Sequence, residues 1–266
     1  EASGVARDPR RGDLLWIHDD EGEAFALVAV DTAGNALGRA PIGEIGLRDP
    51  EDLALGRCGE VWCLYLGDIG DNPAVRDEVR VHRLPLPGVP PGEADGWGTE
   101  ELPPIAPERT WTFRYPDGPR DAEALAVDDG VGELIVISKG WDGRAIVYSA
   151  PLSGARDGAA APATLVRQGA LPFGSGGESV GFVTGADLSP DGKTLAVRTY
   201  VALYLVPWSG AAEFGRVTGV RKVPLGPARE PQGEGVAFGS EPGVLHLVSE
   251  SRWGRPPRLS RVVCPP

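Results

Sequence analysis

Residues 49–72 read DPEDLALGRCGEVWCLYLGDIGDN and predict a β-hairpin. Two short runs of apolar, β-prone residues, 53–55 and 63–66, are separated by residues 56–60, whose two glycines suit a tight turn. In an antiparallel hairpin the start of the first strand lies beside the end of the second strand. The two ends of this segment should therefore meet at the open end of the hairpin.

Acidic residues gather at that open end. Glu51 and Asp52 start the first strand, Asp68 ends the second strand, and Asp71 and Asn72 follow just beyond it. Carboxylates this close repel one another unless water, a cation or a basic ligand compensates their charge. The hairpin therefore predicts a candidate site as well as a fold.

Four further versions of this hairpin occur along the chain. Each consists of an apolar run, a turn containing Gly, Asp or Pro, and a second apolar run, and a third apolar run follows. The copies lie at residues 3–20, 122–140, 185–200 and 233–251. Four short strands that repeat at roughly 40–60 residues are typical of a β-propeller blade, whereas a β-sandwich needs no repeated unit.

The sequence therefore predicts an all-β fold: a single β-propeller over residues 1–266, in five blades of four antiparallel strands, with six blades as the alternative. No obvious fourth strand follows Cys264, so the last blade should be three-stranded or closed by a piece outside this sequence. The Pro- and Gly-rich residues 85–108 and 151–163 read as long connections inside the second and third blades.

The charge balance argues against some functions. The chain has 26 Lys and Arg residues against 38 Asp and Glu residues, a formal charge of −12. A nucleic-acid-binding surface is expected to carry a basic patch, whereas an acidic chain favours solubility and local cation binding. No apolar run approaches the roughly 18 residues that suggest a membrane span. We expect a monomer that binds neither nucleic acid nor membrane.

The cysteines and the first residue bear on the compartment. Cys58 and Cys63 flank the turn of the hairpin at 49–72, where a disulfide is geometrically reasonable, with two reduced thiols as the alternative. Cys264 is expected to be a free, buried thiol. A disulfide implies an oxidising compartment, and a removed signal peptide or tag would explain a sequence that starts at Glu1. We expect a secreted or periplasmic protein.

The five hairpins should bring their polar ends to one mouth of a central channel, because the first strand of each propeller blade lines that channel. Aligning the copies places polar or small residues at equivalent strand starts: Ser3, Glu51, Glu123, Ala186 and Glu234. Asp52 and Asp187 come directly after two of these positions. Lys139 and Arg198 end two of the second strands, so they should reach the same face.

These residues suggest chemistry at the mouth. Oxygen ligands suit a hard cation such as Ca²⁺, and the predicted metal ligands are Asp52, Asp68, Asp71, Asn72 and Asp187. The predicted catalytic residues are Glu51, Glu123 and Glu234 as acid–base groups, with Lys139 and Arg198 to hold an anionic substrate group. Trp141 and Trp253 would stack on a sugar. The alternative is that these charges only pair with one another, Lys139 with Glu123 and Arg198 with Asp187.

Two further motif candidates are weaker. Residues 177–181, GESVG, match the G-x-S-x-G string, but that motif needs a strand–turn–helix and we expect none here. His18 lies near the predicted mouth and would be a candidate base, although a lone strand histidine is more often structural.

Several segments resemble known propellers. Residues 189–197, SPDGKTLAV, resemble hairpins of lactonase-like and WD-like repeats. DPEDLA with LYLGDIGDN, and DAEALAVD with LIVISK, resemble secreted bacterial propellers of the phytase-like and esterase-like group. That resemblance implies calcium at an acidic face and hydrolysis of phosphorylated or ester substrates, although this chain lacks the Lys- and Arg-rich face of phytases. Five-bladed glycosidases such as arabinanases place three acidic residues at the channel mouth, as Glu51, Glu123 and Glu234 would.

The sequence thus predicts a calcium-binding propeller with hydrolase-like activity on a small anionic or carbohydrate substrate. The alternative is a non-catalytic propeller that binds a ligand or another protein. A catalytic site would need at least one buried carboxylate with a shifted pKa in a cleft.

Overall fold

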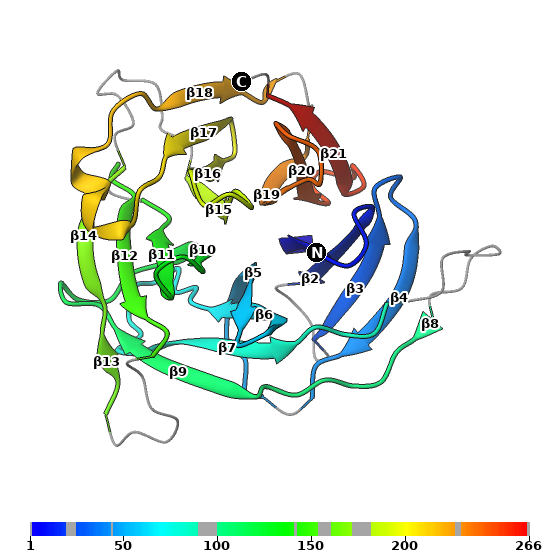
Figure 1. Ribbon diagram of the computed structural model, residues 1–266, viewed down its shortest axis with the longest axis horizontal. Coiled ribbons are helices and arrows are strands. Elements are labelled where there is room, and N and C mark those ends of the chain that lie inside the picture. Colours follow the sequence, from blue (N-terminus) through cyan, green and yellow to red (C-terminus); the bar gives the residue numbers. More distant parts are fainter. Residues whose placement is uncertain are drawn as a thin grey trace.

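The computed structural model describes residues 2–19, 25–43, 45–89, 100–140, 143–153, 161–171, 182–226 and 230–264. Within these residues the strands form five sheets arranged as blades around one axis (Figure 1). The prediction of a five-bladed β-propeller is confirmed, and the six-bladed alternative is wrong. No helix in this part of the chain has the length and apolar character needed to span a membrane.

Each blade is built from consecutive strands, starting at the axis and moving outward. The first two blades contain β1 (Ala2–Arg7), β2 (Leu14–Asp19), β3 (Ala26–Asp31) and β4 (Ala36–Pro41), then β5 (Pro50–Cys58), β6 (Val61–Asp68), β7 (Val79–Pro85) and β9 (Arg109–Arg114). The third and fourth contain β10 (Ala122–Asp128), β11 (Glu133–Ser138), β12 (Ile146–Pro151) and β14 (Val166–Ala170), then β15 (Val183–Leu188), β16 (Thr194–Thr199), β17 (Ala202–Pro207) and β18 (Arg221–Pro224). The fifth contains β19 (Gln232–Phe238), β20 (Val244–Glu250) and β21 (Arg258–Val263).

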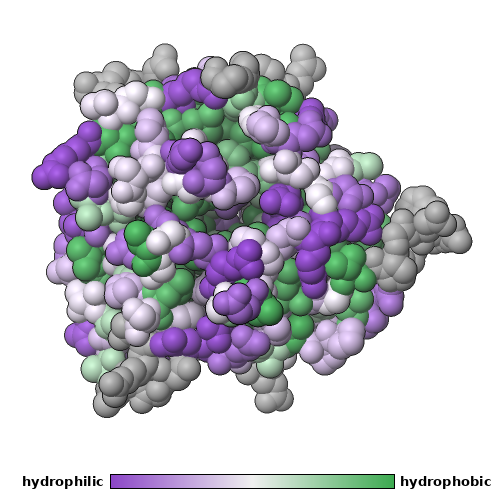
Figure 2. All heavy atoms as spheres, viewed as in Figure 1, coloured by the Kyte–Doolittle hydropathy of each residue, from purple (hydrophilic) through white to green (hydrophobic). Residues whose placement is uncertain are grey.

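The five first strands close a ring around the axis, in which each contacts both neighbours and β19 contacts β1. Apolar side chains fill the interfaces between blades; Tyr65 and Trp111 of the second blade, for example, share one buried cluster with Tyr148 of the third. Figure 2 shows hydrophilic residues spread over the face seen in this view, with hydrophobic residues mainly in the recesses between them. The core is therefore divided among the blade interfaces.

The two long connections reach outside their own blades. β8 (Glu100–Glu101) pairs in parallel with β4 of the first blade, and β13 (Ala163–Thr164) pairs in parallel with β9 of the second blade. Each connection therefore covers the outer edge of the preceding blade, which shields otherwise unpaired backbone groups. The fifth blade has three strands among the described residues, as one of the two predicted alternatives requires. A short 3₁₀ helix, η1 (Ala211–Arg216), lies against β14.

Every first strand has a register shift near its start, which marks a β-bulge. The shifts fall between Ala2 and Val5, Pro50 and Asp52, Ala122 and Ala124, Val183 and Gly185, and Gly233 and Val236. The residues inside these shifts include Ser3, Glu51, Glu123, Thr184 and Glu234. The predicted equivalence of the three glutamates is confirmed, but the placement of Ala186 in this set is wrong by two residues. Because β15 is shorter than β5, the similar strings ADL and EDL occupy different heights in their blades.

The predicted cysteine states are confirmed. Cys58 and Cys63 form a disulfide across the turn between β5 and β6, with Cα atoms 5.9 Å apart, and Cys264 is a buried free thiol. The disulfide closes the end of the hairpin that lies opposite to Glu51 and Asp68.

Candidate functional site

The bulged positions form a ring of buried polar side chains at the mouth where the first strands begin. The relative exposure is 7% or less for each of Ser3, Glu51, Glu123, Thr184 and Glu234. The Ser3 hydroxyl donates to the Glu51 carbonyl at 2.5 Å, and the Thr184 hydroxyl donates to the Glu234 carbonyl at 3.0 Å. Bulges re-aim side chains and are frequent beside active sites. We call this end of the channel the acidic mouth.

Three carboxylates converge at the acidic mouth. Glu51, Asp121 and Glu123 each offer one oxygen atom, and these atoms lie within 4.8 Å of one another. Asp121 comes just before β10, and its Oδ1 accepts a hydrogen bond of 2.8 Å from the Asp71 backbone N–H. The sequence prediction missed Asp121. The sequence pattern that could have identified Asp121 is Asp-x-Glu, which occurs at residues 49–51 and again at 121–123.

Lys139 supplies a cation to this cluster. Its Nζ donates a hydrogen bond to Glu123 Oε1 and lies 4.0 Å from Asp121 Oδ2. Burial alone would lower the pKa of Lys139, but Glu123 raises it above its ordinary value. Lys139 is therefore a permanent ammonium group, and it compensates one of the three clustered carboxylates.

Two glutamates at the acidic mouth have raised pKa values. Burial raises the pKa of Glu123 to about 7, with Asp121 adding to the shift and Lys139 opposing it. Burial raises the pKa of Glu234 to about 9, and the charges of Glu123 and Glu250 add to that shift. Glu234 Oε1 is buried and has no hydrogen-bond partner among the described residues. With a pKa of about 9, the Glu234 carboxyl is mostly protonated at pH 7.

The pH dependence of stability should report the Glu234 shift. Its folded-state pKa lies above its ordinary value of 4.5, so its contribution to stability is fully present below about pH 4.5 and is lost as the pH rises through about 9. We expect Glu234→Gln to be more stable than the parent protein by a few kcal/mol at pH 9 and by much less at pH 5. Urea denaturation across this pH range measures the difference. A pH-independent difference would contradict the assignment.

Of the predicted metal ligands, Asp52 lies deeper in the channel. Its Oδ1 accepts the Leu53 N–H at 2.8 Å, and its Oδ2 accepts the N–H groups of Leu125 at 2.8 Å and Ala186 at 3.1 Å. Burial raises the pKa of Asp52 to about 8, against the effect of these hydrogen bonds. Asp52 thus ties β5, β10 and β15 together across the channel.

Asp68 and Asp71 are engaged with their own loop. Arg76 Nη1 lies 3.0 Å from Asp68 Oδ1, and the Arg76 backbone N–H donates to Asp71 Oδ2 at 2.6 Å. Asn72 is exposed. The structure therefore does not gather the five predicted metal ligands into one group. The described carboxylates that do converge here are Glu51, Asp121 and Glu123.

The remaining predicted residues do not join this carboxylate group. Asp187 lies near the other end of the channel, where its Oδ2 accepts the Phe238 N–H at 2.7 Å. Arg198 is fully buried and pairs with Glu230 at 2.5 Å, not with Asp187 as the pairing alternative required. His18 Nε2 accepts the Gly4 N–H at 3.2 Å, which is a structural role. Trp253 is 77% exposed, while Trp141 and residues 177–181 lie outside the described residues.

Comparisons with known proteins support the fold. No family model and no curated protein matches the chain. Among solved structures, a luciferin-regenerating enzyme is 13% identical in sequence to this chain, with a TM-score of 0.50. The match covers 99% of this chain and 91% of the enzyme's chain. The PQQ-bound aldose sugar dehydrogenase of Streptomyces coelicolor is also 13% identical, with a TM-score of 0.51. That match covers 98% of this chain and 93% of the dehydrogenase chain. Likenesses at this identity show that this chain shares the β-propeller fold with these enzymes.

Proposed function

We propose that the acidic mouth is a hydrolase-like site that binds a calcium ion and acts on a small anionic or carbohydrate substrate. The observation that carries this proposal is the convergence of Glu51, Asp121 and Glu123 near Glu234, whose buried Oε1 has no hydrogen-bond partner among the described residues. Glu234 would protonate the leaving oxygen of the substrate as a general acid, since it is neutral at pH 7. The Lys139 ammonium group would attract an anionic substrate group.

The cluster fits a calcium ion in donor type, spacing and charge. Calcium takes oxygen ligands at roughly 2.3–2.6 Å, and three carboxylate oxygens within 4.8 Å of one another can share one such ion. Lys139 offsets one of the three carboxylate charges, and a divalent cation would balance the other two when Glu123 is ionised. Bound calcium would polarise a substrate oxygen. The disulfide supports export to an oxidising compartment, secreted or periplasmic, where calcium is abundant.

Calcium binding should raise thermal stability. A ligand at about 100 times its dissociation constant adds about 2.7 kcal/mol when it binds only the folded state. We expect the melting temperature to rise with calcium and to fall with EDTA. Asp121→Asn should remove most of this response, because it keeps an oxygen for the Asp71 N–H but loses the charge. Glu60→Gln, in the exposed turn after β5, is the control and should respond like the parent protein. A melting temperature unchanged by calcium, magnesium and EDTA would rule out the metal.

A screen of ester, phosphate and glycoside substrates tests catalysis separately. With any substrate found, Glu234→Gln should lower kcat about 10²–10⁴-fold, as expected for loss of a general acid. Full activity in Glu234→Gln would refute that role.

The burial of the site favours one alternative, a non-catalytic binding propeller. Glu123 is already paired with Lys139, and the ring side chains are at most 7% exposed. Such a protein would bind a carbohydrate or small anion without turnover in the same screen.

A further inference from the structure

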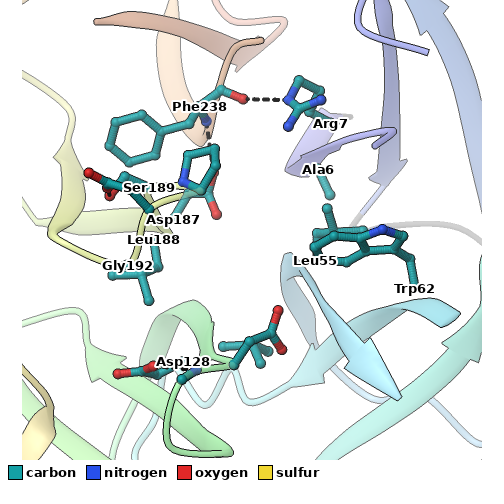
Figure 3. Close-up of a pocket in the computed structure, with 15 residues that line it drawn as sticks. Ala6, Arg7, Leu55, Trp62, Asp128, Asp187, Leu188, Ser189, Gly192 and Phe238 are labelled. Carbon is teal, nitrogen blue, oxygen red and sulfur yellow. Dashed lines mark hydrogen bonds between the residues drawn. The ribbon is translucent and has the colours of Figure 1, made fainter. Parts of the chain in front are cut away.

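A cavity lies at the end of the channel opposite to the acidic mouth, where the first strands end (Figure 3). Its volume of about 350 Å³ is within the range of small-molecule sites. All five blades contribute to its wall, and Figure 3 labels among others Arg7, Leu55, Trp62, Asp128, Asp187 and Phe238. Asp52 bridges three strands between the two mouths, so this cavity is separate from the acidic mouth.

The polar groups of this cavity are fixed by the backbone. Arg7 Nε donates to the Phe238 carbonyl at 3.2 Å, and Asp187 Oδ2 accepts the Phe238 N–H at 2.7 Å. Asp128 accepts the Trp208 indole N–H at 2.7 Å and the Gly130 N–H at 3.0 Å. Side chains held in this way are preorganised, which lowers the entropic cost of binding a ligand.

The charge of the wall selects the ligand. The wall contains four carboxylates and one guanidinium, those of Asp128, Asp129, Asp187, Asp191 and Arg7. Two further cations lie beside it, since Arg57 stacks on Trp62 and Lys193 Nζ lies 3.9 Å from Asp191, so the carboxylates outnumber the cations by one. Arg7 also donates to two backbone carbonyls, including that of Asp8 at 3.3 Å. An anion would therefore meet net negative charge, whereas a cation would be attracted.

The other part of the wall is apolar. Ala6, Leu55, Val127, Leu188 and Phe238 line the cavity, and Leu55, Leu188 and Phe238 are partly exposed. Trp62 lies at the rim, and the Arg57 guanidinium stacks 3.9 Å from the centre of its indole ring, as a cation does on an aromatic face. A hydrated metal ion would leave this apolar surface uncovered, but an organic cation with an apolar body would cover it.

We propose that this cavity binds a small organic ammonium ion whose apolar body lies against Leu55 and Val127 and whose charge lies near Asp129 and Asp187. The proposal is independent of the function assigned to the acidic mouth. It assigns the cavity a ligand of one positive charge and a compact aromatic or cyclic body.

Isothermal titration calorimetry with matched probes tests the proposal. Benzylamine and cyclohexylamine carry the charge, benzyl alcohol is neutral and benzoate is anionic, while all four have similar size. We expect the two amines to bind at least ten-fold more tightly than benzyl alcohol, and benzoate not to bind. Asp129→Asn and Asp187→Asn should each weaken amine binding about five-fold, and Glu60→Gln, outside the cavity wall, should not. Asp129 is exposed, so its variant keeps the fold.

Four outcomes would overturn the proposal. Equal binding of benzyl alcohol would mean a merely apolar cavity. Displacement of the amines by calcium at equal concentration would mean a site for inorganic cations. Failure of both amines to bind, or full binding by the Asp129→Asn and Asp187→Asn variants, would mean that this cavity is no ammonium site.

Discussion

Replacing Asp52 by alanine is expected to lower the free energy of unfolding by about 3–9 kcal/mol, because three buried N–H donors lose their acceptor at about 1–3 kcal/mol each. These donors belong to β5, β10 and β15, so the loss should loosen the contact between three blades at once. Urea denaturation of the purified variant measures the change.

Two further variants serve as comparisons for Asp52→Ala. Asp52→Asn keeps one acceptor oxygen and should fall between the parent protein and Asp52→Ala. Asp13→Ala removes a carboxylate whose side chain is 53% exposed and pairs with Arg11, so it should cost less than about 1 kcal/mol. If Asp52→Ala also cost less than 1 kcal/mol, Asp52 would not hold the blades together.

Replacing Arg198 by methionine is expected to cost about 3–5 kcal/mol, the usual effect of leaving one partner of a buried ion pair alone. Arg198 Nη1 donates to the carbonyls of Gly235 at 2.6 Å and Val248 at 2.7 Å, while Nη2 pairs with Glu230. Arg198 therefore fastens β16 of the fourth blade to β19 and β20 of the three-stranded fifth blade.

A double variant separates this role from substrate binding. Adding Glu230→Gln to Arg198→Met removes the buried Glu230 charge that has lost its partner. The free energy of unfolding should then recover by more than about 1 kcal/mol. Arg216→Met, at a side chain 80% exposed, is the matched control and should be near neutral. If Arg198→Met were as stable as the parent protein but lost ligand binding at the acidic mouth, the substrate-binding role predicted from sequence would be favoured instead.

The two ends of the channel differ in chemistry because the first strands differ in composition at their two ends. The bulged starts carry glutamates beside one lysine, where we propose a divalent cation and proton transfer. The strand ends carry aspartates beside apolar residues, where we propose an organic cation. Binding experiments on variants of one end should therefore leave the other end unaffected.

The amino-acid sequence by itself determined the repeated unit. Alternating apolar runs and turns are local signals, so the five hairpins, the three equivalent glutamates and the disulfide across one turn could all be predicted from neighbouring residues. The pairing of Lys139 with Glu123, which the sequence left open as an alternative to substrate binding, is likewise made within one hairpin.

Only the tertiary structure decided which polar groups share the site. Asp121 lies close to Glu51 although the two residues belong to different blades. The Asp52 carboxylate accepts hydrogen bonds from N–H groups of β10 and β15, and Arg198 is buried against the fifth blade. The pairings of β8 with β4 and of β13 with β9 likewise cross between blades. The fourth blade shows the reason most directly: a shift of two residues along β15 moved the expected position from Ala186 to Thr184. The position of a residue along its strand and the partners of its side chain depend on bulges and on packing between distant segments. No local sequence pattern encodes these.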